Sequence, residues 1–219
     1  MPRVTVRCPW CEGSDEYIRY HDDEWGRPVV DDAKLFEKIC LEGFQSGLAW
    51  ITVLRKREGF REAFANFDPT KVARFTDNKV ERLLGNAGII RHRGKIESTI
   101  NNAQRLNEMH RSGESLADLV WSHADRKASP APDAMNHLPA STDASTALSK
   151  ALKKRGWSFV GPTTMYAFMQ SMGVVNDHFA GCHVRSACDR ERRAILRSGV
   201  GASRAPDTLI RTTRGGAAR

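Results

Sequence analysis

The sequence lacks any hydrophobic run long enough to cross a membrane as a helix. No apolar stretch approaches the roughly 18 residues that such a span requires, so an integral membrane protein is excluded. Residues 1–8 also lack the apolar segment of a secretion signal, and we expect a cytoplasmic protein. Internal repeats and the polar–apolar alternation of β-strands are missing as well, so the expected class is all-α.

Cysteine is scarce and unevenly spaced. The chain has five cysteines, at positions 8, 11, 40, 182 and 188. An odd number at irregular intervals does not fit a disulfide framework, and thiols in the cytoplasm stay reduced. The cysteines are therefore expected to be metal ligands or buried thiols.

Basic charge is concentrated near the C-terminus. The formal net charge is +8, and residues 190–219 contribute eight arginines against two acids, or +6 of that total. Such a segment attracts anions. We expect residues 1–188 to form one domain and residues 189–219 to form a basic, flexible tail.

Helical patterns dominate the expected domain. Residues 50–64 are predicted to form one long helix, and a further helix is predicted to begin or continue at residues 177–182. Residues 126–145 hold three prolines and many small polar residues, which indicates a loop between two parts of the fold.

Four residues near the two ends of the domain form a candidate metal-binding set. His178 and Cys182 are four residues apart, and Cys8 and His21 lie near the other terminus. Two cysteines and two histidines would bind zinc in a closed, structural site. Three nearby residues are alternative ligands: Cys11, His183 and Cys188. Buried thiols and hydrogen-bonded histidines without a metal would explain the same residues.

Aromatic residues and one acid gather in the first quarter of the chain. The aromatic residues are Trp10, Tyr17, Tyr20, Trp25 and Trp50. Glu42 lies among apolar neighbours, where a carboxylate needs a partner or a function. Aromatic walls and one carboxylate would suit a flat, cationic base, which stacks on the rings and donates hydrogen bonds to the acid. The alternative is an ordinary aromatic core beside a solvated glutamate.

A Gly-Pro turn followed by hydroxyl residues is a candidate phosphate-binding element. Gly161 and Pro162 follow one predicted helix, and Thr163 and Thr164 begin the next. The free backbone N–H groups at a helix start can bind a DNA phosphate. An ordinary corner between two helices would look the same.

Several of these segments together resemble the bacterial 3-methyladenine DNA glycosylase I family. The segments that carry the resemblance are Tyr17–Gly26, Leu35–Gly43, Gly47–Leu54, Ala87–Ile96, Ala147–Gly156, Phe159–Thr164 and Val175–His178. The resemblance covers about residues 7–182 in order, and residues 189–219 have no counterpart in it.

The resemblance implies a fold and a set of site residues. It implies the helix-hairpin-helix glycosylase fold, with a structural Zn²⁺ joining the N- and C-terminal segments. The implied zinc ligands are Cys8, His21, His178 and Cys182. The implied catalytic residues are Glu42 and Tyr20, and the implied substrate-binding residues are Trp10, Tyr17 and Trp50. The implied DNA-binding residues are Leu48, which fills the gap left by the flipped nucleotide, and Gly161, Thr163 and Thr164.

The implied activity is monofunctional excision of 3-methyladenine from alkylated double-stranded DNA, the first step of base excision repair. A monomer is the default expectation for the oligomeric state. Related glycosylases carry a catalytic aspartate where Asn176 stands here, and we expect the neighbouring Asp177 not to face the pocket. A DNA-binding damage sensor and a glycosylase with broader or lyase activity are the alternatives. A lyase needs a nucleophilic lysine near the hairpin, and residues 163–172 contain none.

Overall fold

A computed structural model describes residues 5–127 and 130–202. In these ranges the chain forms α-helices and short 3-10 helices, with no β-strand. The elements are η1 Pro9–Cys11, α1 Asp15–Asp23, α2 Asp32–Gln45, α3 Trp50–Leu54, α4 Arg57–Ala63, η2 Ala65–Phe67, α5 Pro69–Val72, α6 Asp77–Leu84, α7 Arg93–Arg111, α8 Leu116–Ser122, η3 Met135–His137, α9 Asp143–Lys154, α10 Pro162–Ser171 and α11 Arg185–Ser198. The predicted all-α class is confirmed.

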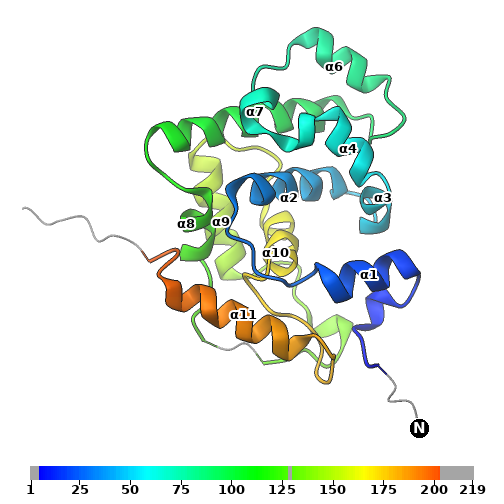
Figure 1. The fold of residues 1–219 in the computed structure, drawn as a ribbon, viewed down its shortest axis with the longest axis vertical. Coiled ribbons are helices and arrows are strands. Elements are labelled where there is room, and N and C mark those ends of the chain that lie inside the picture. The colour runs from blue at the N-terminus through cyan, green and yellow to red at the C-terminus, as the bar shows by residue number, and fades with distance from the viewer. Residues whose placement is uncertain (1–4, 128–129, 203–219) are drawn as a thin grey trace, which may run out of the picture.

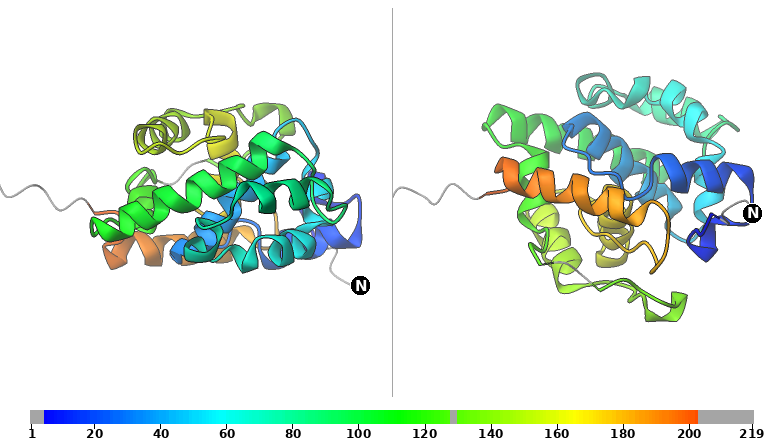
Figure 2. Two further views of the ribbon diagram at one scale, coloured as in Figure 1. Left: turned by 90° about the horizontal axis from the view of Figure 1, so that it is seen from above. Right: turned by 60° about the horizontal axis from the view of Figure 1, so that its bottom comes forward.

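Helix α2 lies at the centre of the molecule. It contacts α7 on one side and α10 on the other, with α6 beyond α7 and α11 along the outside (Figures 1 and 2). The Asp31 side chain accepts a hydrogen bond from Lys34 N and caps the helix, as expected for an acidic N-cap. Residues 38–44 are buried without interruption, and a helix buried on all sides is a core element. Among the described helices, none has both the length and the apolar character needed to cross a bilayer.

The predicted helix over residues 50–64 is two helices. Helix α3 ends at Leu54 and α4 begins at Arg57. The change of direction brings Phe60 and Phe64 into the core, where both rings pack against Phe44. Burying these rings outweighs the continuity of one helix. The predicted loop over residues 126–145 is largely confirmed in its described part, with η3 and the start of α9 as its regular parts; residues 128–129 lie outside the described residues.

Two predictions about the C-terminal part are wrong. Residues 177–182 form turns, because the Asn176 side chain accepts the His178 backbone N–H and Gly181 adopts a φ of 82°. The expected flexible tail does not start at residue 189, since α11 continues to Ser198. Arg192 on this helix is buried and donates to Val174 O at 2.8 Å. The remainder of the expected tail, residues 203–219, lies outside the described residues.

Asp32 links α2 to α8 through hydrogen bonds. Its carboxylate accepts hydrogen bonds from Leu116 N at 3.0 Å and Ala117 N at 2.7 Å, and it contacts His110 Nε2 at 2.7 Å. The acid therefore satisfies two N–H groups at the start of α8 that have no partner within that helix.

Replacing Asp32 by alanine is expected to lower the free energy of unfolding by about 1–3 kcal/mol, because the α8 N–H groups lose their acceptor. Thermal unfolding followed by circular dichroism would measure a fall in Tm of roughly 2–4 °C per kcal/mol. The matched control is Asp143→Ala, which removes an exposed acid from the first turn of α9. Equal effects of the two replacements would contradict the capping role.

Candidate functional site

A cavity of about 200 Å³ lies between α1, the end of α2, the start of α3 and α10. Its lining is mainly aromatic and apolar, with one acid and two amides. The lining residues are Trp10, Tyr17, Tyr20, Trp25, Glu42, Gln45, Trp50, Met135, Leu138, Ala167 and Gln170. This volume is below the usual range for drug-sized ligands, and it suits one planar group the size of a nucleobase.

The cavity walls are held by contacts between aromatic rings. Trp10 meets Tyr17 edge-on with ring centroids 5.6 Å apart, and Tyr20 and Trp50 lie 5.5 Å apart. The Tyr17 hydroxyl accepts a hydrogen bond from Ile51 N at 2.9 Å. Ile51 follows Trp50 in the first turn of α3. The hydrogen bond to Tyr17 therefore holds Trp50 in position as one wall of the cavity.

Glu42 brings a buried carboxylate to the cavity. Its side chain is 4% exposed, and Oε1 pairs with Lys38 Nζ at 3.0 Å. Oε2 is buried and has no hydrogen-bond partner among the described residues. Burial raises the pKa of Glu42, and the charge of Lys38 opposes that shift. One carboxylate oxygen is thus available to accept a hydrogen bond from a ligand.

Tyr20 lies beside Glu42. Its hydroxyl accepts a hydrogen bond from Lys38 Nζ at 2.8 Å, so its own hydrogen stays free to be donated. Burial raises the pKa of Tyr20 well above its usual value, which keeps the phenol protonated. The sequence-based assignment of Tyr20 and Glu42 to one site agrees with this proximity.

Leu48 lies in the turn between α2 and α3 and is 42% exposed. Lys95 Nζ donates to Phe44 O at 2.9 Å and to Ser46 O at 2.6 Å. These bonds fix the backbone just before Leu48, so the apolar side chain stands on a rigid turn at the surface.

The turn between α9 and α10 leaves space outside Gly161. This residue is the N-cap of α10 with a φ of −63°, which any residue can adopt, and a Cβ added there would meet no atom within 4 Å. The protein itself therefore does not require glycine at this position. Thr163 is exposed and Thr164 is half-buried in the first turn of α10.

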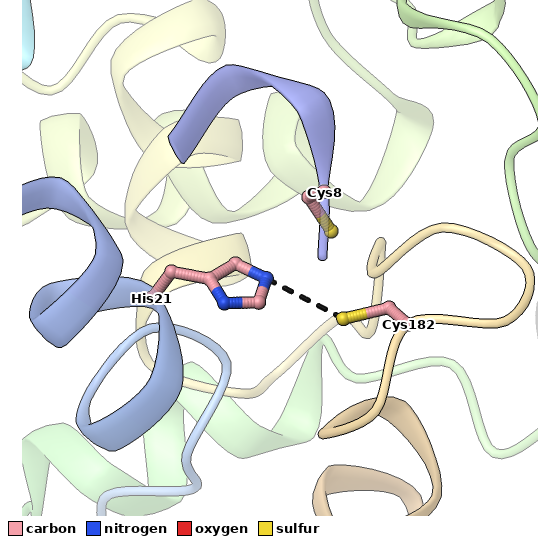
Figure 3. A group of neighbouring side chains, drawn as sticks. All are labelled: Cys8, His21 and Cys182. Atoms are coloured by element: carbon pink, nitrogen blue, oxygen red, sulfur yellow. Dashed lines mark hydrogen bonds between the residues drawn. The ribbon is translucent and has the colours of Figure 1, made fainter. Parts of the chain in front are cut away.

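Cys8, His21 and Cys182 come together where the N-terminal segment of the described chain meets the turn before α11 (Figure 3). Their ligand atoms all lie within 4.8 Å of one another, and all three residues are buried. Asp22 Oδ1 lies 2.8 Å from His21 Nδ1, which directs His21 Nε2 toward Cys182 Sγ at 3.4 Å. Hydrogen bonds from Cys8 and His21 lower the pKa of Cys182 to about 3.

His178 lies beside this group without belonging to it. The His178 and His21 ring centroids are 5.1 Å apart. His178 Nδ1 contacts Asn176 Oδ1 at 2.8 Å, and its buried Nε2 has no partner among the described residues. Two thiols, one imidazole and this unpaired nitrogen fit the ligand preference of zinc. Gly26 makes room for the His178 ring, since a Cβ there would lie 2.4 Å from Cε1.

The alternative zinc ligands lie outside the group formed by Cys8, His21 and Cys182. Cys11 Sγ donates to Cys8 O at 3.1 Å and stays outside the three-residue group. His183 Nε2 contacts Asp22 Oδ1 at 2.9 Å, and with His21 these residues form a second, more exposed group. Cys188 packs in the same small apolar cluster as Cys8 and Cys182.

A family model for methyladenine glycosylases matches residues 10–186. The chain belongs to the methyladenine glycosylase family. A DNA-3-methyladenine glycosylase from Haemophilus influenzae is 50% identical over 186 residues, which are 84% of this chain and all of that protein. DNA-3-methyladenine glycosylase 1 from Escherichia coli is 54% identical, covering 80% of this chain and 95% of that protein.

Solved structures of methyladenine glycosylases share the fold. A crystal structure of 3-methyladenine DNA glycosylase I superimposes with a TM-score of 0.79 at 54% identity, covering 81% of this chain and 98% of that chain. A structure describing 3-methyladenine recognition by the Staphylococcus aureus enzyme has a TM-score of 0.77 at 33% identity, covering 82% and 96%. The resemblance stated from the sequence is thereby confirmed.

Asn176 and Asp177, in the segment after α10, do not line the aromatic cavity. Asn176 donates to Asp189 Oδ1 at 2.7 Å and to Arg185 O at 3.1 Å. Asp177 accepts from the Tyr166 hydroxyl at 2.6 Å and lines a different cavity of about 550 Å³. Both are committed to structural hydrogen bonds.

Sequence reasoning missed Lys38, which contacts Glu42 from the preceding turn of α2. The four-residue spacing of this pair within an apolar segment was a usable signal. Met135 and Leu138 also line the cavity, but they come from an irregular loop whose sequence gave no indication of its position.

Proposed function

We propose that this chain is a monofunctional DNA glycosylase that excises 3-methyladenine from alkylated DNA and so initiates base excision repair. The observation that carries the proposal is the free Glu42 Oε2 inside an aromatic cavity of nucleobase size. The curated relatives at 50% and 54% identity are named for the same activity.

The cavity offers a hydrogen-bond pattern that matches adenine. An adenine presents its N7 acceptor and its N6 amino donor on one edge. The Tyr20 hydroxyl supplies a donor for N7, and Glu42 Oε2 supplies an acceptor for the amino group. Trp10, Tyr17 and Trp50 surround the ring, and aromatic faces attract a cationic base.

Excision of a cationic base needs little proton transfer. 3-Methyladenine is positively charged while attached to the sugar, so it leaves as a neutral base without a general acid. The protein flips the nucleotide out of the duplex and holds the base, and water then captures the sugar cation. The residues lining the cavity include no lysine that could act as a lyase nucleophile, which supports a monofunctional reaction.

We also propose the DNA contacts and the finer fold assignment. Leu48 fills the gap left by the flipped nucleotide, and its exposure on a fixed turn supports this role. Helices α9 and α10 form the helix-hairpin-helix element, where Gly161, Thr163 and Thr164 bind phosphate through the backbone. The open space around Gly161 allows the close approach that phosphate binding requires.

Zinc is the proposed structural cofactor, held by Cys8, His21, His178 and Cys182. Bound there, the ion would join the N-terminal segment to the turn before α11, segments that lie side by side at the bottom of Figure 1. Zinc with four protein ligands has no open position for catalysis. We further propose that the pocket lies between two lobes of the domain, and that the protein acts on double-stranded DNA as a cytoplasmic monomer.

Release of free bases from methylated duplex DNA tests the proposed activity. Chromatography of the released purines is expected to show 3-methyladenine. Release of 7-methylguanine in comparable amounts would indicate a broader alkylpurine glycosylase. Tight DNA binding by a folded, zinc-loaded sample without base release would indicate a damage sensor and contradict the proposal.

A further inference from the structure

Lys38 is a buried cation in contact with three residues of the proposed recognition site. Its Nζ lies 3.0 Å from Glu42 Oε1, 2.8 Å from the Tyr20 hydroxyl and 3.4 Å from the centroid of the Trp50 ring. The Lys38 side chain is only 7% exposed. Burying a charged lysine this deeply costs free energy unless its charge is paired and hydrogen-bonded.

Lys38 contacts these residues from the side of Tyr20 and Trp50 that faces away from the aromatic cavity. Tyr20 and Trp50 line both the aromatic cavity and a second, neighbouring cavity of about 350 Å³. Lys38 lines only the second cavity, and Glu42 lines only the aromatic one. A base in the aromatic cavity is therefore separated from Lys38 by the wall, so Lys38 acts through other side chains as a positioning residue.

The contacts of Lys38 determine what its neighbours present to a base. An ammonium group only donates hydrogen bonds. By donating to the Tyr20 oxygen, Lys38 leaves the Tyr20 O–H as a donor. By pairing with Glu42 Oε1, it stabilises the ionised carboxylate and leaves Oε2 as an acceptor. The cavity therefore presents one hydrogen-bond donor, the Tyr20 hydroxyl, beside one acceptor, Glu42 Oε2.

That pattern distinguishes the two purines. Adenine offers an acceptor at N7 and a donor at N6, whereas guanine offers acceptors at both N7 and O6. An ionised carboxylate cannot donate to O6, and two facing acceptors repel each other. A protonated carboxyl group could donate to O6, so selectivity for adenine depends on Glu42 staying ionised.

We propose that Lys38 is a specificity-determining residue that fixes this donor–acceptor pattern and thereby makes the enzyme select 3-methyladenine over 3-methylguanine. The inference rests on the proposed function. Burial raises the pKa of Glu42 and the charge of Lys38 lowers it, in agreement with this role. Tyr17, Glu24 and Arg57 also act electrostatically on Tyr20 or Lys38, and the last two pair with each other at 2.9 Å. The other charged side chains that line the second cavity with Lys38 are Asp23, Arg27, Lys34, Glu37 and Arg61.

The test compares Lys38→Met with the unaltered protein on methylated duplex DNA that contains both lesions. The ratio of kcat/KM for 3-methyladenine to that for 3-methylguanine is expected to fall by about tenfold, the effect of one hydrogen bond to a charged group. Lys38→Arg keeps the charge and is expected to restore most of the ratio. The matched control is Lys34→Met, which removes an exposed lysine one turn earlier on α2, and it should leave the ratio unchanged.

The pH dependence of selectivity distinguishes an effect of the Lys38 charge from an effect of Lys38 packing. Without Lys38 the pKa of Glu42 rises further, so a larger fraction of Glu42 is protonated at low pH. Selectivity of Lys38→Met should therefore recover as pH increases from about 6 to 9. A selectivity equal to that of the unaltered protein at every pH would overturn the inference. An equal loss on both lesions at every pH, with Tm unchanged or lowered, would overturn it too, because that result indicates packing alone.

The Glu42→Gln variant distinguishes the two levels of proposal. If Glu42→Gln impairs release of 3-methyladenine while Lys38→Met retains full selectivity, only the role of Lys38 fails. If Glu42→Gln has no effect, the recognition role of Glu42 fails, and the inference about Lys38 fails with it. Absence of base release by the unaltered protein is a failure of the proposed activity and is detected before any variant is compared.

Discussion

Replacing Glu42 by glutamine is expected to lower kcat/KM for 3-methyladenine release by about 10- to 100-fold. Glutamine keeps the shape of the side chain but removes the charge that attracts a cationic base and strengthens its hydrogen bond. Hydrogen bonds to charged groups contribute roughly 1.5–3 kcal/mol, and each 1.36 kcal/mol corresponds to about tenfold in rate. Steady-state kinetics on methylated DNA would measure the effect.

The matched control for this variant is Glu37→Gln on the same helix. Glu37 pairs with Arg61 at 2.7 Å and does not line the aromatic cavity. It is expected to keep full activity, with thermal unfolding showing that both variants are folded. Equal kcat/KM for Glu42→Gln and the unaltered protein would refute the recognition role of this carboxylate.

Replacing Cys182 by alanine is expected to abolish binding of one zinc ion per chain and to lower Tm by roughly 6–12 °C. The site joins residues 8 and 21 to the turn before α11, so losing the metal releases both ends of the domain. A loss of about 3 kcal/mol corresponds to that change in Tm for a protein of this size. Metal analysis of the purified protein and calorimetry would measure the two quantities.

Cys11→Ala serves as the control for the zinc prediction. Cys11 is as buried as Cys8 and lies three residues away, but its sulfur is outside the ligand group. This variant should keep its zinc. The same zinc content in Cys182→Ala and the unaltered protein would contradict the ligand assignment.

The sequence was sufficient to predict the helical class and most of the aromatic cavity. Glu42 stood out because a carboxylate in an apolar segment requires an explanation, and the structure places it against Tyr20 and Trp50. The residues alone offered Cys8 and Cys182 as one candidate metal set among several, and the family resemblance selected that set. The spacing argument for His178 and Cys182 assumed a helix, whereas the backbone there forms turns.

What the sequence did not predict depends on tertiary contacts. The break between α3 and α4 follows from the burial of Phe60 and Phe64, which local helix propensity does not describe. The extent of α11 was missed because its arginine-rich composition resembles a solvated tail, yet Arg192 is buried with its guanidinium on backbone carbonyls. The role of Lys38 depends on the side chains of three separate helices and requires the folded chain.

The most direct test of the account is an NMR titration of the protein with free 3-methyladenine, following the indole N–H signals of its five tryptophans. Trp10, Trp25 and Trp50 line the aromatic cavity, whereas Trp121 and Trp157 are buried in the main core. The account predicts saturable shifts of the Trp10 and Trp50 signals, unchanged core signals, and weaker binding in Glu42→Gln. The absence of shifts at Trp10 and Trp50, or equal binding by Glu42→Gln and the unaltered protein, would contradict it.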